Sequence, residues 1–407
     1  MGEAMKILRF ALMLLFVALV FLIVWEQGGG AREGGPFRLA VKETVQLPVK
    51  QWWFFKAGDV ARTDRQLLWI QPTGKKQTMP LPERTVDVQF SPEGRYYAVV
   101  QLLDAVVAPG GWQEGRILLH PLGKDALYTV AFRRAYDEGL PLVAVSDRAD
   151  LIVVRNTTAE MEVYDPTGNR IFASALFPQA AYDLERKVAV LSVTDGGRMF
   201  VAITRHGMTE KGSDPFLILL LMDGTEIWRQ ALPAHGFTHL VVAPNGRFAA
   251  VGTYRIGPNR LFHRRTVVYD DSGKRVAESD LLMKYGRFSS DAEYLLLAEN
   301  QRAALLNVIS GKIVWSYDLP EGAAPIAAID LSRGGKTAAL LIAHGEFRDN
   351  TFQFVNPGLL ILNKQGAVMQ ELSFDGQQFL APALQLSATG QDIFIGFQQE
   401  KQTFRVK

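Results

Sequence analysis

The sequence predicts an all-β protein, a β-propeller of four-stranded blades that follows one N-terminal transmembrane helix. Three observations predict it: strand-length apolar runs separated by turn residues, a unit of such runs that recurs, and a long apolar run near the N-terminus. In the clearest unit, Gly286–Pro320, four short runs alternate with polar turns, and none is long enough for an ordinary helix. A single four-stranded sheet cannot bury both of its faces, so the units must stack on one another.

Copies of this unit recur along the chain at a period of roughly 45–55 residues, which is the spacing of propeller blades. The inner half of the unit recurs in Val86–Val100, Val143–Val154, Val190–Ile203, Leu240–Gly252, Ala328–Ile342 and Leu384–Phe397. The outer hairpin recurs as VYDPTGNRIFA, LLMDGTEIWRQ, VYDDSGKRVAE, LNVISGKIVWS and ILNKQGAVMQE. We expect eight blades. A ring of seven is the alternative, with the irregular copy in Thr44–Pro82 as a partial blade.

The N-terminal apolar run extends without interruption from Phe10 to Trp25 and approaches the ~20 residues that a helix needs to cross a bilayer. Lys6 and Arg9 precede it, which favours a cytoplasmic N-terminus and an exported remainder. We therefore expect residues 1–26 to anchor the chain in the inner membrane, with a periplasmic or extracellular propeller. The alternative is a cleaved signal peptide, but no small-x-small cleavage site closely follows the run.

Residues 27–36, QGGGAREGGP, have the composition of a flexible linker, and we assign residues 37–407 to the propeller. Phe37–Val41 forms a single strand-like run with no partner in its own unit, whereas the last unit, Pro382–Lys407, has about three runs. We expect the N-terminal strand to complete this last blade, because closure of the ring removes two exposed sheet edges.

The composition narrows the classes of function. Hydrophobic residues make up 48% and charged residues 21% of the 407 residues, so the chain can build a core. The net charge of +2 does not indicate a nucleic-acid partner. Cysteine is absent, which excludes disulfides and thiolate metal sites.

The units resemble the PQQ-like and WD40-like propeller repeats, of the membrane-anchored bacterial type. NVISGKIVWSYDLP is similar to the Gly-Lys-x-x-Trp hairpin of PQQ-type blades, and SPEGRYYAVV and APNGRFAAVG look like WD40-like turns. The quinone-dependent dehydrogenases on this scaffold carry an adjacent cysteine pair, which this chain lacks. The layout is similar to that of envelope propellers, including the lipoprotein propeller of the outer-membrane assembly machinery. We expect the outer-hairpin residues Trp69, Trp228 and Trp315 to pack between blades.

Four connections between the second and third strands of a unit are long: Asp104–Gly115, Arg205–Pro215, Tyr254–Arg265 and His344–Pro357. Equivalent connections of a propeller project from one face, so we expect the four loops to gather there. They are rich in aromatic residues and arginine, the types enriched at binding hot spots. The predicted partner-binding residues are Trp112, Arg205, Arg255, Arg260, Phe262, Arg264, Arg265, Phe347, Arg348 and Phe352. The arginines would also suit acidic glycans or phospholipid head groups, and long loops that merely cover one another are the structural alternative.

No motif in the sequence carries a recognisable catalytic chemistry. His235 and His239 are four residues apart, a spacing that suits a metal-binding pair on a helix. They lie instead in a loop that leads into a strand, so we expect no metal or cofactor. The inner strands offer only Asp87 and Asp330 as titratable groups for the channel. We therefore expect a non-catalytic interaction scaffold or sensor in the cell envelope, with an envelope or membrane protein as its partner. The alternative is a propeller enzyme or small-ligand binder that uses the central channel.

Overall fold

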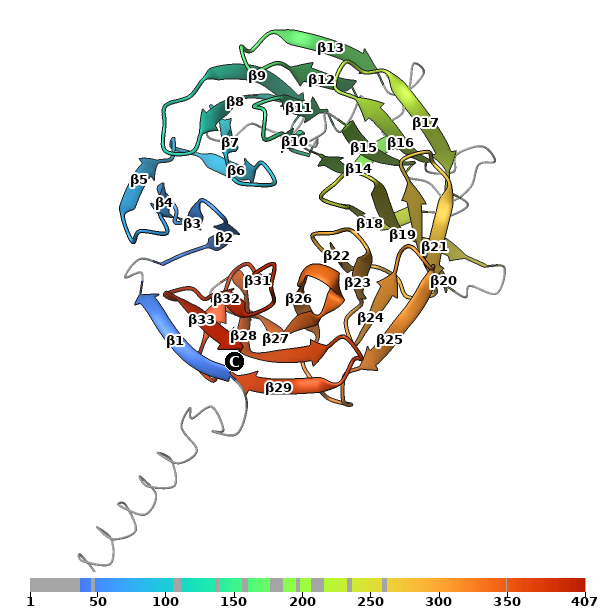
Figure 1. The fold of residues 1–407 in the computed structure, drawn as a ribbon. Helices are drawn as coiled ribbons and strands as arrows, with labels where there is room; N and C mark the ends of the chain where they lie inside the picture. The colour runs from blue at the N-terminus through green and yellow to red at the C-terminus, as the bar shows by residue number, and fades with distance from the viewer. Residues whose placement is uncertain are drawn as a thin grey trace, which may run out of the picture.

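The chain forms a ring of eight β-sheets around a central channel (Figure 1). The structure is a computed structural model that describes residues 37–44, 48–104, 111–135, 139–155, 160–175, 186–194, 198–205, 216–232, 236–257, 262–348 and 350–406. Each sheet is antiparallel. Seven sheets have four strands in sequential order from the channel outwards, one of which gains a short fifth strand, and the eighth has the order β31-β32-β33-β1. The prediction of eight blades is confirmed, and the seven-bladed alternative is wrong, because the Thr44–Pro82 region contains a complete blade.

The first four blades follow the chain in order. Blade 1 comprises β2 (Gln51–Phe55), β3 (Gly58–Arg62), β4 (Gln66–Ile70) and β5 (Lys76–Pro80). Blade 2 comprises β6 (Thr85–Phe90), β7 (Tyr96–Leu102), β8 (Trp112–Pro121) and β9 (Tyr128–Ala135). Blade 3 comprises β10 (Leu142–Val145), β11 (Leu151–Val154), β12 (Glu160–Tyr164) and β13 (Arg170–Ala175). Blade 4 comprises β14 (Arg186–Val193), β15 (Arg198–Arg205), β16 (Phe216–Leu221) and β17 (Glu226–Ala231).

The last four blades include the two that depart from the simple pattern. Blade 5 comprises β18 (Gly236–Val242), β19 (Phe248–Ile256), β20 (Phe262–Asp270) and β21 (Arg275–Ser279). Blade 6 comprises β22 (Tyr285–Phe288), β23 (Tyr294–Ala298), β24 (Arg302–Asn307) and β25 (Lys312–Asp318). Blade 7 comprises β26 (Ile326–Leu331), a 3₁₀ turn (Arg333–Gly335), β27 (Thr337–Arg348), β28 (Thr351–Asn363), β29 (Val368–Ser373) and β30 (Gln378–Phe379). Blade 8 comprises β31 (Ala383–Leu386), β32 (Asp392–Gly396), β33 (Glu400–Val406) and the N-terminal strand β1 (Phe37–Thr44).

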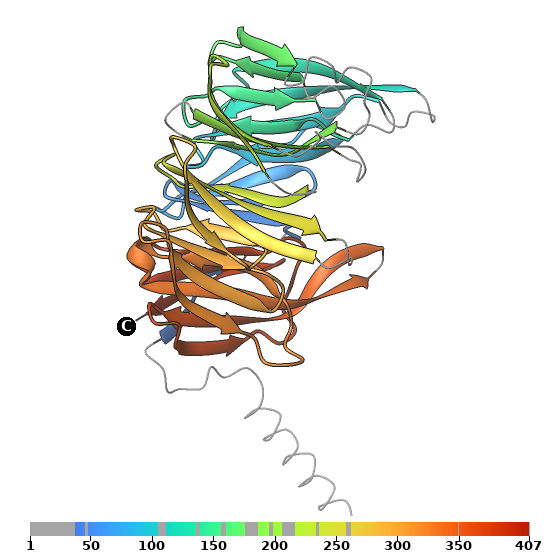
Figure 2. The same cartoon turned by 90° about the vertical axis from the view of Figure 1, so that its right-hand side faces the viewer.

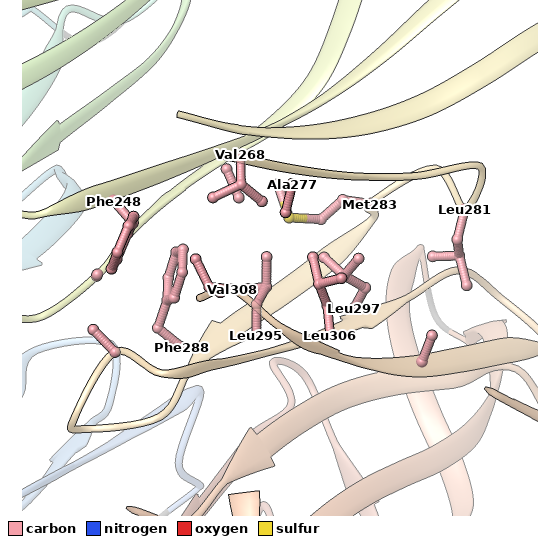
Figure 3. Packing of buried hydrophobic residues seen from close by; sticks show 14 residues of the cluster. Phe248, Val268, Ala277, Leu281, Met283, Phe288, Leu295, Leu297, Leu306 and Val308 are labelled. Carbon is pink, nitrogen blue, oxygen red and sulfur yellow. The ribbon is translucent and has the colours of Figure 1, made fainter. Parts of the chain in front are cut away.

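The middle strands are continuously apolar because both of their faces are covered by neighbouring blades. Successive side chains of a strand point to opposite faces. In β23, Leu295 and Leu297 pack into the core shared with blade 5, whereas Leu296 and Ala298 pack into the core shared with blade 7. Figure 3 shows the first of these cores. Strand-length apolar runs without alternation therefore indicate buried strands here, not helices.

Aromatic residues of the outer hairpins fill the space between adjacent blades. The glycine in the turn between a blade's third and fourth strands packs on an aromatic ring of the preceding blade. The pairs are Gly123 on Trp69, Gly168 on Tyr128, Gly224 on Phe172, Gly273 on Trp228 and Gly366 on Trp315. The predicted packing role of the three tryptophans is confirmed.

The ring closes between blades 8 and 1. β1 pairs with β33 from Phe37, opposite Val406, to Thr44, opposite Glu400. The indole N–H of Trp52 donates to the carbonyl of Phe397 at 2.8 Å, and Lys401 forms a largely buried ion pair with Asp59. These contacts join residues more than 340 positions apart in the sequence, so the ends of the chain hold the ring together.

The predicted membrane span and linker lie outside the described residues. Within the part of the chain that the structure describes, no helix has the length and apolar character to cross a bilayer.

Candidate partner-binding face

The strand order places all connections between second and third strands on one face of the ring, which we call the hairpin face. The β7–β8, β15–β16, β19–β20 and β27–β28 connections all belong to it. Figure 2 shows the β27–β28 hairpin and, in teal, the start of β8 paired with the end of β9, both extending beyond the ring on the same side. They belong to blades 7 and 2, so the extensions share a face but rise from different parts of the ring.

Two of the four predicted loops, Tyr254–Arg265 and His344–Pro357, are largely strands, which corrects the interpretation drawn from the sequence, whereas most of the other two lies outside the described residues. β27 and β28 run in register to Arg348 opposite Thr351, and β19 and β20 run to Ile256 opposite Phe262. Pro357 lies within β28, although proline cannot donate to a ladder. It lies beside an irregularity in register between Ile342 and His344, a position that tolerates proline.

The distal part of the β27–β28 hairpin is stabilised by a row of four phenylalanine rings. Phe347 pairs with Phe352 across the two strands, and Phe354 pairs with Phe379 of β30. The ring centroids of consecutive members, Phe347–Phe352–Phe354–Phe379, are 5.2 Å apart at each step. Exposure rises from 2% at Phe379 to 44% at Phe352 and 79% at Phe347. The row therefore starts in the core between blades 7 and 8 and ends in solvent.

A groove of about 540 Å³ lies beside this hairpin, and we call it the hairpin groove. Its walls come from the hairpin tip, the segment that leads into blade 1, and the connection from blade 7 to blade 8. The lining residues are Pro48, Val49, Lys50, Asp64, Arg348, Thr351, Phe352, Gln353, Gln378, Leu380, Ala381 and Gln398. The volume is within the range of ligand sites, about 300–1,000 Å³.

The structure brings together three of the predicted partner-binding residues: Phe347, Arg348 and Phe352 lie at the tip of one hairpin. Arg348 forms an exposed ion pair with Glu346 at 2.9 Å. Trp112 is 53% exposed, but it belongs to blade 2, where the guanidinium of Arg133 lies 4.7 Å from its ring centroid.

The predicted arginines of blade 5 lie on the β19–β20 hairpin. Arg264 and Arg265 approach carboxylates of Glu299 and Glu278 at 3.7 and 3.6 Å. Arg255 is exposed opposite His263. Arg205 ends β15 and Phe262 begins β20, both on the hairpin face, whereas Arg260 lies outside the described residues. These residues do not line the hairpin groove.

The central channel contains two cavities, of about 560 Å³ towards the hairpin face and about 500 Å³ towards the opposite face. Arg287, Asp330 and Gln385 line both cavities. The buried Asp330 carboxylate accepts hydrogen bonds from Arg287 Nε at 2.7 Å and from the Leu386 N–H at 2.5 Å, so it joins the inner strands of blades 6, 7 and 8. Of the two predicted channel carboxylates, Asp330 lines a described cavity, and its contacts give it a structural role.

His239 lines the channel cavity nearer the hairpin face. Its side chain is accessible to solvent, but the surrounding walls desolvate the ring and lower its pKa, despite a hydrogen bond with the backbone of Thr238 that raises it. Its predicted neighbour His235 lies outside the described residues. Among the described residues there is no group of three or more histidine, aspartate or glutamate side chains that could hold a metal ion.

Sequence reasoning missed the part of the site that comes from outside the hairpins. Lys50 lies in the connection that leads into blade 1, and Gln378 lies in the short strand β30; neither stretch carries a sequence signal of binding. Lys50 reaches the hairpin groove because ring closure places blade 1 beside blade 8, and Gln378 reaches it because β30 pairs with β28. The predicted ring closure is the signal that would have found Lys50.

Comparison with known proteins supports the fold. No protein-family model and no curated protein sequence matches the chain. BamB from Moraxella catarrhalis is similar in structure, with a TM-score of 0.57 and 13% identity over 90% of this chain and 100% of that chain. The C-terminal WD40 domain of Sif2 has a TM-score of 0.54 and 10% identity over 91% and 98% of the two chains. Sqt1 from Chaetomium thermophilum, bound to the N-terminus of ribosomal protein L10, has a TM-score of 0.53 and 10% identity over 91% and 100%. The chain thus has the fold of the WD40-like and PQQ-like β-propellers.

Proposed function

We propose that this eight-bladed propeller is a non-catalytic interaction scaffold, tethered to the inner membrane, that binds an envelope protein through its hairpin face. The observation that carries the proposal is the exposure of Phe347 and Phe352 on a hairpin that projects beyond the ring. Exposed aromatic side chains beside arginine are typical of binding hot spots. Sqt1, a propeller of similar fold, was solved with a protein segment bound.

The tether is proposed from the apolar run Phe10–Trp25 and from the place where the described chain begins. Phe37 lies opposite Val406 at the end of β33 that is remote from the hairpin face. The preceding linker of about ten Gly-rich residues has a root-mean-square length of roughly 17 Å. The propeller would therefore stay close to the bilayer with its hairpin face directed away from it.

The binding part of this proposal is tested by crosslinking in native membranes. The intact chain is compared with the double variant Phe347→Ser and Phe352→Ser, and with a control in which the exposed Ile313 and Val314 of β25 become serine. We expect one envelope protein to be captured by the intact chain and the control, and to be lost at least tenfold from the hairpin variant. Equal capture by all three would overturn the assignment of the face.

The tether is tested separately by fractionation and by protease treatment of spheroplasts. We expect the chain to remain in carbonate-washed membranes and its propeller to be accessible to external protease. Recovery in the soluble fraction, or protection from external protease in intact spheroplasts, would contradict the proposed location.

A second candidate function, binding of a small ligand in the channel, is favoured by the two cavities that share Arg287 and Asp330. A thermal-shift screen of small organic acids and sugars tests it. A ligand whose stabilising effect disappears in Arg287→Gln, but persists in the outer-strand control Arg302→Gln, would favour the channel over the hairpin face as the functional site.

A further inference from the structure

The outer edge of β28 changes partner along its length. β29 pairs with Gly358–Leu362, and β30 pairs only with Phe354 and Val355. Beyond them, Thr351–Gln353 has β27 on one side and, among the described residues, no strand on the other. This unpaired stretch forms one wall of the hairpin groove.

The backbone of Phe352 directs its hydrogen-bonding groups into the groove. The N–H of Asn356 donates to the carbonyl of Gln377 at 3.1 Å, which continues the register of the β28–β30 pair. Alternate residues of an antiparallel strand direct their N–H and C=O to the same side. The N–H and C=O groups of Phe354 therefore face β30, and those of Phe352, two residues closer to the hairpin tip, face the open groove. An exposed strand edge of this kind is a template for an added strand.

The side chains around the groove complement this edge. Phe352, Leu380, Ala381 and Val49 give the groove an apolar part of its lining. The charged lining residues are Lys50, Arg348 and Asp64, which give a net charge of one positive unit. Both cations form ion pairs at exposed positions, Lys50 with Asp64 and Arg348 with Glu346. Exposed ion pairs contribute little to stability, about 0–1 kcal/mol. Lys50 and Arg348 can therefore exchange their present partners for a carboxylate of a bound segment.

We propose that the hairpin groove binds an extended segment of a partner protein, which adds to the edge of β28 as a short strand beyond β30. The segment places an apolar side chain against Phe352 and a carboxylate near Lys50 and Arg348. This is β-strand addition, in which main-chain hydrogen bonds give affinity and pockets for alternate side chains give specificity. The same kind of pairing already occurs within the chain, because the two-residue strand β30 adds to the edge of β28. The inference rests on the proposed function and specifies the chemistry of its partner.

The test uses the full-length chain in detergent and a phage-displayed library of linear twelve-residue peptides. We expect enriched peptides to alternate apolar and polar residues and to contain at least one carboxylate. Their affinity, measured by fluorescence anisotropy, should fall at least tenfold in Phe352→Ala and in Arg348→Glu. The matched controls are Ile313→Ala, an exposed apolar side chain on β25 outside the groove lining, and Arg302→Glu, a paired arginine on β24, and both should retain binding.

A second measurement separates strand addition from side-chain binding alone. An enriched peptide with alternate backbone nitrogens methylated should lose binding, because it can no longer donate to the β28 edge. Equal affinity of the methylated peptide, insensitivity to both groove variants, or no enrichment at all would overturn the inference. If membrane crosslinking still depends on Phe347 and Phe352 in that case, the scaffold function stands and only strand addition fails.

Discussion

The carboxylate of Asp165 fixes the turn between the third and fourth strands of blade 3. Its Oδ1 accepts hydrogen bonds from the hydroxyl of Thr167 at 2.7 Å and from the N–H groups of Thr167 and Asn169 at 2.8 and 2.9 Å. The bond from the Thr167 hydroxyl is the main reason that the pKa of Asp165 lies below its usual value. The pKa of Asp270 is lowered by similar bonds from Ser272 and Lys274, which outweigh the opposing effect of partial burial.

These residues predict that the propeller loses stability in acid. A carboxylate whose pKa is lower in the folded chain stabilises the fold above its unfolded pKa, about 3.9, and this stability is lost as pH falls through the folded pKa. The variant Asp165→Asn plus Asp270→Asn should lose less stability between roughly pH 5 and pH 3 than the parent chain. Asn363 shows that an amide oxygen can accept the equivalent backbone bonds in blade 7. Urea midpoints measured across this range provide the check, and parallel pH profiles for the two proteins would contradict it.

The outer hairpins depend on glycine for two separable reasons, backbone conformation and contact with the preceding blade. Gly74 and Gly224 occupy equivalent turns with φ of 81° and 84°. A Cβ at Gly224 would overlap the ring of Phe172, whereas a Cβ at Gly74 would have no neighbour within 4 Å. The two glycines therefore share the left-handed conformation and differ only in packing.

Replacement of these glycines by alanine should separate the two effects. Gly74→Ala is expected to lower the free energy of unfolding by about 1–2 kcal/mol through the left-handed backbone alone. Gly224→Ala adds steric overlap between blades 3 and 4, which costs about 1–3 kcal/mol more. Urea denaturation of both variants measures the difference. Equal losses would show that the turn glycines do not limit how closely the blades approach.

At this scale the sequence predicted the repeated elements well and their connections poorly. The four runs predicted within Gly286–Pro320 are the four strands of blade 6, and the second is clear because both faces of β23 are buried and its apolar run ends sharply. The β27–β28 extension was predicted as a loop because it separates two apolar runs of the repeat, whereas its pairing involves partners outside the repeated unit, such as β30. Phe347, Arg348 and Phe352 were identified from residue type, but no local pattern joins Lys50 to them.

The whole ring depends on β1, since it supplies the outermost strand of blade 8. A chain that begins at residue 45 should unfold at lower urea concentration than one that begins at residue 37. It should also self-associate, because β33 becomes an exposed edge. Light scattering after size-exclusion chromatography, with urea denaturation, compares the two chains. A monomeric 45–407 chain with an unchanged midpoint would show that the ring closes without its N-terminal strand.

The position of β1 also determines how the molecule would bear mechanical load. Any pull transmitted from the N-terminus enters the propeller at Phe37, the first residue of the strand that holds the ring shut. Tension along β1 would shear its whole ladder with β33 at once, whereas a sideways pull would open the pairs one after another from Phe37. A tether and a partner on opposite faces would pull roughly along the strand. The ring would thus resist force best in the direction in which a membrane-tethered scaffold is loaded.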